Sequence, residues 1–145
     1  MRSRGFTLIE LAMVLAVLGL LASLAVPSYR GVLLRARAAE ARIGLEGIAD
    51  AELRYFRDHG RFLACAPEPP GAPPRGTTAR FDATAPGWRE LGFRMEGPVR
   101  YRYEIGLEGT TFVAIARGDL TGDGKSSTFT LRGDTLKLTV EDELE

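Results

Sequence analysis

The sequence predicts an α+β fold, in which one long N-terminal helix packs on a roughly four-stranded antiparallel β-sheet. The first observation is an apolar run over residues 6–26, interrupted by a single carboxylate. The second is that helical spacing continues over residues 28–59, now with an amphipathic pattern. The third is the alternation of apolar and polar residues with period two from Val99 onward. A chain of 145 residues has room for one such domain and an anchor.

The apolar segment has the length and the flanks of a membrane anchor. Phe6–Val26 contains 21 residues, enough to cross about 30 Å of hydrocarbon as a helix. Arg2 and Arg4 precede it and favour a cytoplasmic N-terminus. A secretory signal peptide has a shorter apolar core, of roughly 7–15 residues, and ends in an A-x-A-like cleavage site. The exit of this segment, SLAVPSYR, is a poor site of that kind, so the sequence favours an anchor.

Glu10 is the carboxylate inside this apolar segment. Acidic residues within a membrane span are rare, and they are usually paired. A plain anchor leaves the charge unexplained, because an isolated charge in an apolar medium is strongly penalised. An ammonium and a carboxylate that are desolvated together attract strongly, so we expect Glu10 to have a cationic partner.

The stretch RGFTLIEL, with Gly5, Phe6 and Glu10 in this order, resembles the opening segment of type IV pilins and of type II secretion pseudopilins. The resemblance implies cleavage by prepilin peptidase between Gly5 and Phe6, and N-methylation of Phe6. It implies that Glu10 meets the Phe6 ammonium of a neighbouring subunit, and that Pro27 bends or breaks the helix. Glu10 lies about 6 Å along the axis from Phe6, so the pair would set the register between subunits.

The resemblance also implies the organisation of the chain. Its parts are a leader peptide at 1–5, a transmembrane and filament-core half-helix at 6–27, an amphipathic half-helix at 28–59, an αβ-loop at 60–97, and the antiparallel sheet with its tail at 98–145. The expected fold is the type IV pilin fold. The sharp motif lies in the first 27 residues, whereas the rest of the chain matches in architecture.

The function implied is that of a structural, non-enzymatic subunit that polymerises through its N-terminal helix. The subunit would lie in the bacterial inner membrane before assembly, with its N-terminus in the cytoplasm, and in a cell-surface or periplasmic filament afterwards. Its partners would be identical subunits, prepilin peptidase with its N-methyltransferase activity, the inner-membrane pilus or secretion assembly machinery, and the lipid bilayer. The alternatives are a minor pilin, a type II secretion pseudopilin, or a monomeric membrane-anchored binding domain.

The amphipathic half of the helix is predicted to cover the sheet and to end at Gly60. The positions on its predicted inner face keep steps near three and four, and Glu52 is the one polar exception among them. They are Leu34, Ala38, Ala41, Leu45, Ile48, Glu52, Leu53 and Phe56. Each glycine inside the helix lowers helix stability by up to about 1 kcal/mol relative to alanine, so packing must offset this cost. The glycines are Gly19, Gly31, Gly44 and Gly47. We expect Gly19–Pro27 to extend or unwind on assembly, because proline removes a backbone donor.

The segment after the helix is predicted to be irregular, and the last third to form the sheet. PEPPGAPPRGTT is rich in proline and glycine, whereas WRELGFRMEG has room for one helical turn. The strand at 99–105 is half-buried by its alternation. TFVAIAR follows the turn LEGT and is apolar on both faces, which predicts a central strand. STFTLR and TLKLTV, joined at Gly133–Asp134, complete a meander.

One loop has the ligand order of a calcium site. In DLTGDGKSS, the first, third, fifth, seventh and ninth positions are Asp119, Thr121, Asp123, Lys125 (through its carbonyl) and Ser127. Thr130 stands at the twelfth position, where a bidentate glutamate is usual. With two carboxylates, a calcium site here would be weak. The alternative is a glycine-rich hairpin turn in which aspartate caps its own backbone. No other cofactor is implied.

Composition argues against most catalytic and nucleic-acid functions. Cys65 and His59 are the single cysteine and histidine, and a nucleophile pair would also need an orienting group and an oxyanion site. His59 fits a residue at a helix C-terminus, whereas Cys65 is either a buried thiol or a source of intermolecular crosslinks. The helix also carries an arginine-rich face, consisting of Arg30, Arg35, Arg37 and Arg42. Such a face can attract phosphates of lipid headgroups or of DNA, or it can be solvated. No aromatic residues interleave with these arginines, so acidic residues of neighbouring subunits, such as the EDELE end, fit them better than nucleic acid.

Overall fold

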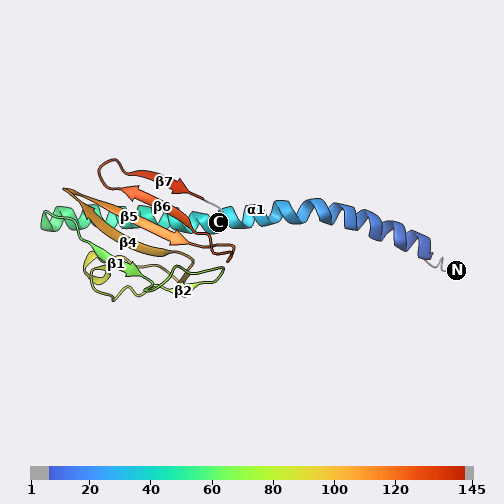
Figure 1. Cartoon of the computed structure of the whole chain (residues 1–145), viewed down its shortest axis with the longest axis horizontal. Helices are drawn as coiled ribbons and strands as arrows, with labels where there is room; N and C mark the ends of the chain where they lie inside the picture. Colours follow the sequence, from blue (N-terminus) through green and yellow to red (C-terminus); the bar gives the residue numbers. More distant parts are fainter. Residues whose placement is uncertain (1–6, 143–145) are drawn as a thin grey trace, which may run out of the picture. The chain divides into compact units, whose positions relative to one another are not determined.

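The computed structural model describes residues 7–142. Helix α1 spans Leu8–His59 (Figure 1). The chain divides into two compact units, and the boundary between them falls within this helix, between Leu33 and Leu34. The leader predicted at 1–5 and the cleavage-site residue Phe6 lie outside the described residues.

The first unit presents an apolar helix with nothing packed over it. Among the described residues, α1 is the one helix that is long and apolar enough to cross a membrane, and none of its most apolar stretch is buried. Leu8, Met13 and Leu20 are examples of its exposed side chains. An uncovered apolar surface of this length requires lipid or other protein around it. The helical assignment is continuous across position 27, so the break expected at Pro27 is absent from the described subunit. Unwinding on assembly stays a prediction.

The second unit contains a five-stranded antiparallel sheet in the order β1-β4-β5-β6-β7. Its strands are β1 Cys65–Glu68, β4 Arg102–Glu108, β5 Thr111–Gly118, β6 Ser127–Arg132 and β7 Lys137–Glu141. The predicted meander is confirmed in β4 to β7, and β5 is central as its two apolar faces predict. The register pairs Ile105 with Ala114 and Ala116 with Phe129.

The sequence-based prediction of a strandless segment at 60–97 is wrong at two places. Strand β1 adds a fifth strand at the edge of the sheet, where Cys65 pairs with Ile105 and Glu68 with Tyr103. A second, two-stranded ladder joins β2 Ala79–Arg80 to β3 Pro98–Val99. Both pairings join residues that are far apart in the sequence, and the strands involved are short. Such strands are too short to show an alternation of apolar and polar residues, and they form because a partner strand offers its backbone groups.

The core of the second unit lies between α1 and one face of the sheet. Ala41, Leu45 and Ile48 of the helix are fully buried against inward side chains such as Phe112 and Phe129. The amphipathic pattern is confirmed up to Glu52. Beyond it the prediction was wrong, because Leu53 and Phe56 are 37% and 43% exposed, whereas Tyr55 is buried. Phe56 instead stacks on Phe62 at a centroid separation of 4.6 Å.

Two of the helix glycines allow aromatic side chains of the second unit to approach α1 closely. A Cβ at Gly44 would lie 2.7 Å from Cε1 of Tyr103, and one at Gly47 would lie 3.1 Å from Cε2 of Phe93. Tyr103 is fully buried. Aromatic rings thus pack directly against the helix backbone at these two glycines, and this packing offsets their low helix propensity.

The helix ends where the sequence predicts. Gly60 adopts a φ of 70°, and its N–H donates to the Phe56 carbonyl over 2.7 Å. This left-handed residue terminates α1 in the way that glycine commonly does. The His59 ring stacks on Tyr55 at 4.0 Å, and its Nδ1 lies 3.1 Å from the Tyr55 carbonyl oxygen.

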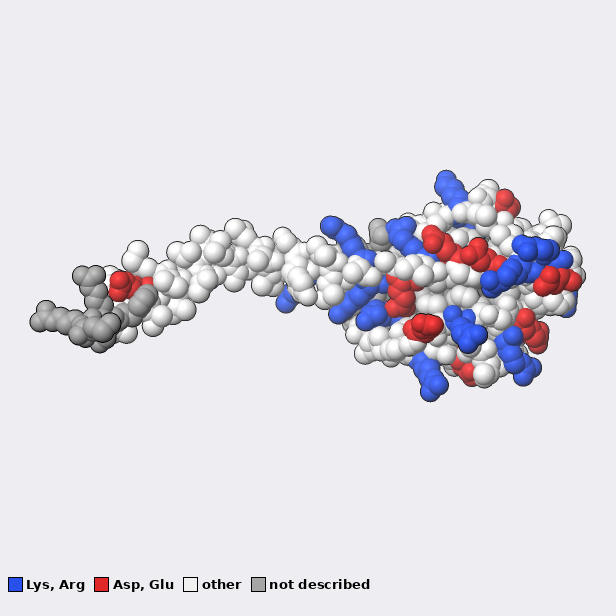
Figure 2. All heavy atoms as spheres, turned by 180° about the vertical axis from the view of Figure 1, so that it is seen from behind, with Lys and Arg blue, Asp and Glu red and all other residues white. Residues whose placement is uncertain are grey.

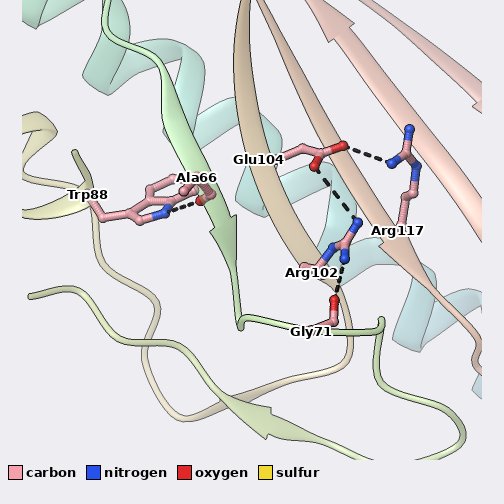
Figure 3. Close-up of polar contacts among 6 residues, drawn as sticks. All are labelled: Ala66, Gly71, Trp88, Arg102, Glu104 and Arg117. Atoms are coloured by element: carbon pink, nitrogen blue, oxygen red, sulfur yellow. Dashed lines mark hydrogen bonds and ion pairs between the residues drawn. The ribbon is translucent and has the colours of Figure 1, made fainter. Parts of the chain in front are cut away.

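Polar contacts fasten the segment 60–97 to the sheet (Figure 3). The predicted helical turn is confirmed as α2 Trp88–Leu91, and the Trp88 indole N–H donates to the Ala66 carbonyl over 2.8 Å (Figure 3). The Arg102 guanidinium donates to the Gly71 carbonyl (Figure 3). Glu104 holds both Arg102, at 3.8 Å, and Arg117, at 2.9 Å. The proline-rich stretch is therefore attached to β4 through Gly71.

Candidate functional site

The first turn of α1 contains the one predicted assembly residue that the structure describes. Glu10 lies in this turn, whereas Gly5 and Phe6 are outside the described residues. Thr7 directly precedes the helix, which begins at Leu8. This puts Thr7 at the N-cap position and Glu10 at the third helical position.

Thr7 and Glu10 form a reciprocal capping pair. Glu10 Oε2 accepts the Thr7 backbone N–H over 2.9 Å and the Thr7 hydroxyl over 2.7 Å. The Thr7 Oγ1 in turn accepts the Glu10 backbone N–H at 3.3 Å. This is the capping-box arrangement, which satisfies two helix N–H groups that would otherwise lack partners. The pattern Thr-x-x-Glu before an apolar run would have identified it from the sequence.

The capping pair gives Glu10 a partner within its own chain, and its pairing with the Phe6 ammonium of a neighbouring subunit stays a prediction. Within the single chain, the carboxylate already receives two hydrogen bonds at Oε2. It also lies at the positive end of the helix dipole, which favours a negative charge. Oε1 makes no hydrogen bond to any part of the chain that the structure describes. One carboxylate oxygen is therefore held by the helix start, and the other is open to a further donor.

No charged residue follows Glu10 until Arg30. In Figure 2 a long uncharged stretch of the helix separates the acidic group near its start from the first basic side chains. The side chains described along this stretch are exposed. The geometry of the first unit is thus a capped acid at the head of an uncovered apolar helix.

The candidate calcium loop directs its best-placed carboxylate at its own backbone. Asp119 is 2% exposed; its Oδ1 accepts the Gly122 N–H at 2.5 Å and its Oδ2 accepts the Gly124 N–H at 2.8 Å. Thr121 donates its hydroxyl to the same carboxylate over 3.4 Å. These contacts are those of a turn capped by aspartate.

Two other predicted calcium ligands, Ser127 and Asp123, also make hydrogen bonds to the chain itself. Ser127 is fully buried, and its hydroxyl donates to the Gly118 carbonyl over 3.1 Å. The Asp123 carboxylate accepts the Lys125 N–H at 3.0 Å, which lowers the pKa of Asp123. Over residues 7–142 no group of three or more His, Cys, Asp or Glu side chains is placed to hold a metal ion. Calcium binding stays a prediction, and it would require these hydrogen bonds to be exchanged.

Cys65 of β1 and Glu52 of α1 are both buried, and they lie near enough for the carboxylate to affect the thiol. Burial, and then the nearby Glu52 and Glu90, raise the pKa of the Cys65 thiol to about 12. The thiol is free and buried, which favours the buried-thiol alternative over a crosslinking role, because the thiolate is the reactive form.

Glu52 is a buried carboxylate on the inner face of α1, where the sequence pattern showed it only as the polar exception among apolar residues. Its side chain is fully buried, and Oε2 accepts the Leu63 N–H over 3.1 Å. Oε1 has no hydrogen-bond partner within the described part of the chain. Burial raises the pKa of Glu52 to about 7, although the bond from Leu63 opposes this shift. The side chain links the helix to the segment that follows Gly60, and it titrates near neutrality.

Comparison with known proteins adds a family signature to this geometry. The model for the prokaryotic N-terminal methylation motif matches residues 1–26. The type IV major pilin protein PilA of Myxococcus xanthus is 36% identical over 84 residues, 58% of this chain and 38% of the relative. The type IV major pilin protein PilE1 of Neisseria gonorrhoeae is 42% identical over 59 residues, 41% of this chain and 36% of the relative. No solved structure matches the chain significantly.

The chain thus spans less than two fifths of the length of these two relatives. The observed long helix on an antiparallel sheet is consistent with the type IV pilin fold. The chain carries a prokaryotic N-terminal methylation motif, and its curated homologues are type IV major pilins.

Proposed function

We propose that the chain is a structural pilin subunit that is cleaved after Gly5, N-methylated at Phe6 and polymerised through its N-terminal helix. The observation that carries this proposal is the capped Glu10, with one open carboxylate oxygen, at the head of an uncovered apolar helix. The methylation motif covers the same residues. The proposed role is structural and non-enzymatic, as the names of the relatives suggest.

The capping pair gives the proposed assembly a physical route. Cleavage creates a new ammonium on Phe6, and the Thr7 contacts hold the Glu10 carboxylate at a fixed place on the helix. The open Oε1 can then accept the Phe6 ammonium of an adjacent subunit without loss of the cap. Two charges desolvated together cost less than either one alone. The contact therefore acts mainly as a determinant of register.

The proposed location follows from the same helix. Before assembly the apolar stretch lies in the inner membrane as a single span with the N-terminus in the cytoplasm, in contact with lipid and with prepilin peptidase. Afterwards it lies in a filament of identical subunits, built by pilus or secretion machinery. The relatives named as major pilins favour a pilus subunit. A minor pilin or a secretion pseudopilin would use the same helix start.

Replacing Gly5 with leucine will leave an unprocessed precursor. The peptidase must accommodate the residue before the scissile bond at the membrane surface, and glycine presents no side chain there. Immunoblotting of membranes should show a single band that runs larger than the wild-type product. Gly31→Ala is the matched control, since a Cβ at Gly31 meets no atom within 4 Å. Normal processing of the Gly5 variant would contradict the assigned cleavage site.

Replacing Glu10 with glutamine will permit membrane insertion and processing but reduce filament yield by at least about tenfold. Glutamine at the third helical position still forms a capping box, so this change removes the charge and keeps the cap. Thr7→Ala does the reverse: it deletes the capping hydroxyl, at about 0.5–2 kcal/mol, and keeps the charge. Sheared filaments can be quantified against membrane-held subunit for both variants.

The pair of variants separates the two roles of Glu10. Loss of filaments in Glu10→Gln with retention in Thr7→Ala supports charge pairing between subunits. Abundant filaments from Glu10→Gln would refute that pairing and leave Glu10 as a helix cap alone.

A further inference from the structure

A basic hollow lies in the second unit, where α1, the loop before β2 and the loop after β5 come together. Its volume is about 370 Å³. The residues that line it are Arg37, Gly76, Thr77, Thr78, Arg100 and Leu120. None of these residues takes part in the proposed helix assembly at Glu10, so the hollow is independent of the proposed function.

Among residues 7–142, the charge of Arg37 in this hollow has no compensating partner. Arg37 is half-buried, yet its guanidinium makes no hydrogen bond or ion pair with any described residue. Glu40, one turn further along the helix, binds the Arg100 backbone N–H at 2.6 Å and its Nη1 at 3.1 Å. Glu40 therefore neutralises Arg100, and no acidic side chain of the described residues pairs with Arg37. A partly desolvated cation in this position is stabilised by any anion that reaches it.

Hydroxyl groups complete the set of donors. The side chains of Thr77 and Thr78 are exposed, and neither hydroxyl has a hydrogen-bond partner among the described residues. Arg37 presents five N–H donors in a planar fork, and the two threonine hydroxyls that line the same hollow add two more. This number exceeds what the two oxygens of a carboxylate accept, whereas the three or more oxygens of a phosphate group match it.

The walls of the hollow are fixed before any ligand arrives. The Gly76 N–H donates to the Asp119 carbonyl over 2.7 Å, and the Asp119 N–H donates to the Pro74 carbonyl over 3.1 Å. The buried Asp119 carboxylate in turn holds the loop that carries Leu120, through Gly122 and Gly124. The loop that resembles a calcium site is thus hydrogen-bonded to the loop that carries Thr77 and Thr78. Preorganised donors lose little entropy on binding.

We propose that this hollow binds the phosphate group of a small organic phosphate ester, with Arg37 as the principal ligand. Thr77 and Thr78 donate hydroxyls to the remaining phosphate oxygens, and Arg100 contributes the part of its guanidinium that Glu40 does not occupy. The hollow is larger than phosphate alone requires, which leaves room for the organic part of an ester. The apolar side chain of Leu120 offers a contact for that part.

Titration of the full-length chain in a neutral detergent tests this site. The probe is inorganic phosphate, added at constant ionic strength against chloride and followed by calorimetry and by the melting temperature. Saturable binding is expected, together with a rise in melting temperature that follows the same isotherm. Arg37→Gln should weaken the binding at least tenfold, whereas Arg35→Gln, which removes an equal charge from an exposed position two residues earlier, should bind as the wild type does.

Three outcomes would overturn the site. They are a response that does not saturate, unchanged binding by Arg37→Gln, and equal weakening by Arg35→Gln, which would indicate nonspecific attraction to the helix. Arg100 is not varied, because its contacts with Glu40 also hold the helix to the sheet. Because Arg37 makes no contact of this kind, its variant is expected to fold and to melt normally without phosphate.

Such an ester can be a soluble metabolite or a lipid headgroup. Binding of glycerol 3-phosphate is therefore compared with binding of phosphatidylglycerol in mixed micelles. Tighter binding of glycerol 3-phosphate identifies a soluble phosphomonoester as the ligand, and tighter binding of phosphatidylglycerol identifies a lipid headgroup. Failure of both to compete with inorganic phosphate would refute the ester and leave a site for the free ion.

Discussion

Replacing Glu52 with glutamine is expected to raise the free energy of unfolding at pH 8.5 by on the order of 2–3 kcal/mol and to leave it nearly unchanged at pH 4. In the folded chain the pKa of Glu52 is about 7, against an ordinary value of 4.5. The folded state therefore binds a proton more tightly than the unfolded state does. The stability that this proton provides is fully present below pH 4.5 and is lost as the pH rises through 7.

Glutamine keeps the shape of the side chain and its carbonyl acceptor for the Leu63 N–H but cannot ionise. Denaturant unfolding can be followed from pH 4 to 9 by the fluorescence of Trp88, which is fully buried in the second unit. The control is Glu46→Gln, since Glu46 lies exposed on the same helix. Wild-type and Glu52→Gln curves that run parallel over this pH range would contradict a buried titrating carboxyl.

Replacing Gly44 with alanine is expected to lower the free energy of unfolding by about 1–3 kcal/mol. The new Cβ would lie 2.7 Å from Cε1 and 2.8 Å from the hydroxyl oxygen of Tyr103, which is fully buried and has little room to move. The gain in helix propensity, about 1 kcal/mol, opposes this overpacking without cancelling it. Urea unfolding with a fixed m-value measures the difference.

Gly31→Ala is the matched comparison for Gly44→Ala. It makes the same chemical change in the same helix, at a position where a Cβ meets nothing within 4 Å. We expect it not to reduce stability. Equal effects of the two substitutions would show that propensity, and not contact with Tyr103, governs the glycine at position 44.

Local periodicity is sufficient to predict most of the fold. The steps of three and four in α1 identify the buried positions Ala41, Leu45 and Ile48, because a helix repeats its face every 3.6 residues. The apolar run of β5 on both faces predicts a central strand for the same kind of reason. The Thr7–Glu10 pair also has a local signal, because Thr-x-x-Glu at the start of a helix is the capping-box pattern.

Features that depend on distant contacts could not be predicted in this way. Strand β1 forms because Cys65 meets Ile105 across 40 positions of chain, and nothing in CAPE itself specifies a strand. The hollow around Arg37 requires two loops that are far apart in the sequence. The environment of Glu52 likewise depends on the burial of a side chain whose type usually occurs at the surface.

The position of β1 at an edge of the sheet affects whether strands of other molecules can pair with the sheet there. A free sheet edge presents unpaired N–H and C=O groups that invite another strand. Strand β1 occupies one edge of the sheet, and it contains Pro67 and is followed by Pro69 and Pro70. Proline offers no N–H to an incoming strand. The β1 edge is thus a poor template for a strand of another molecule, even where sheets of different molecules lie close together.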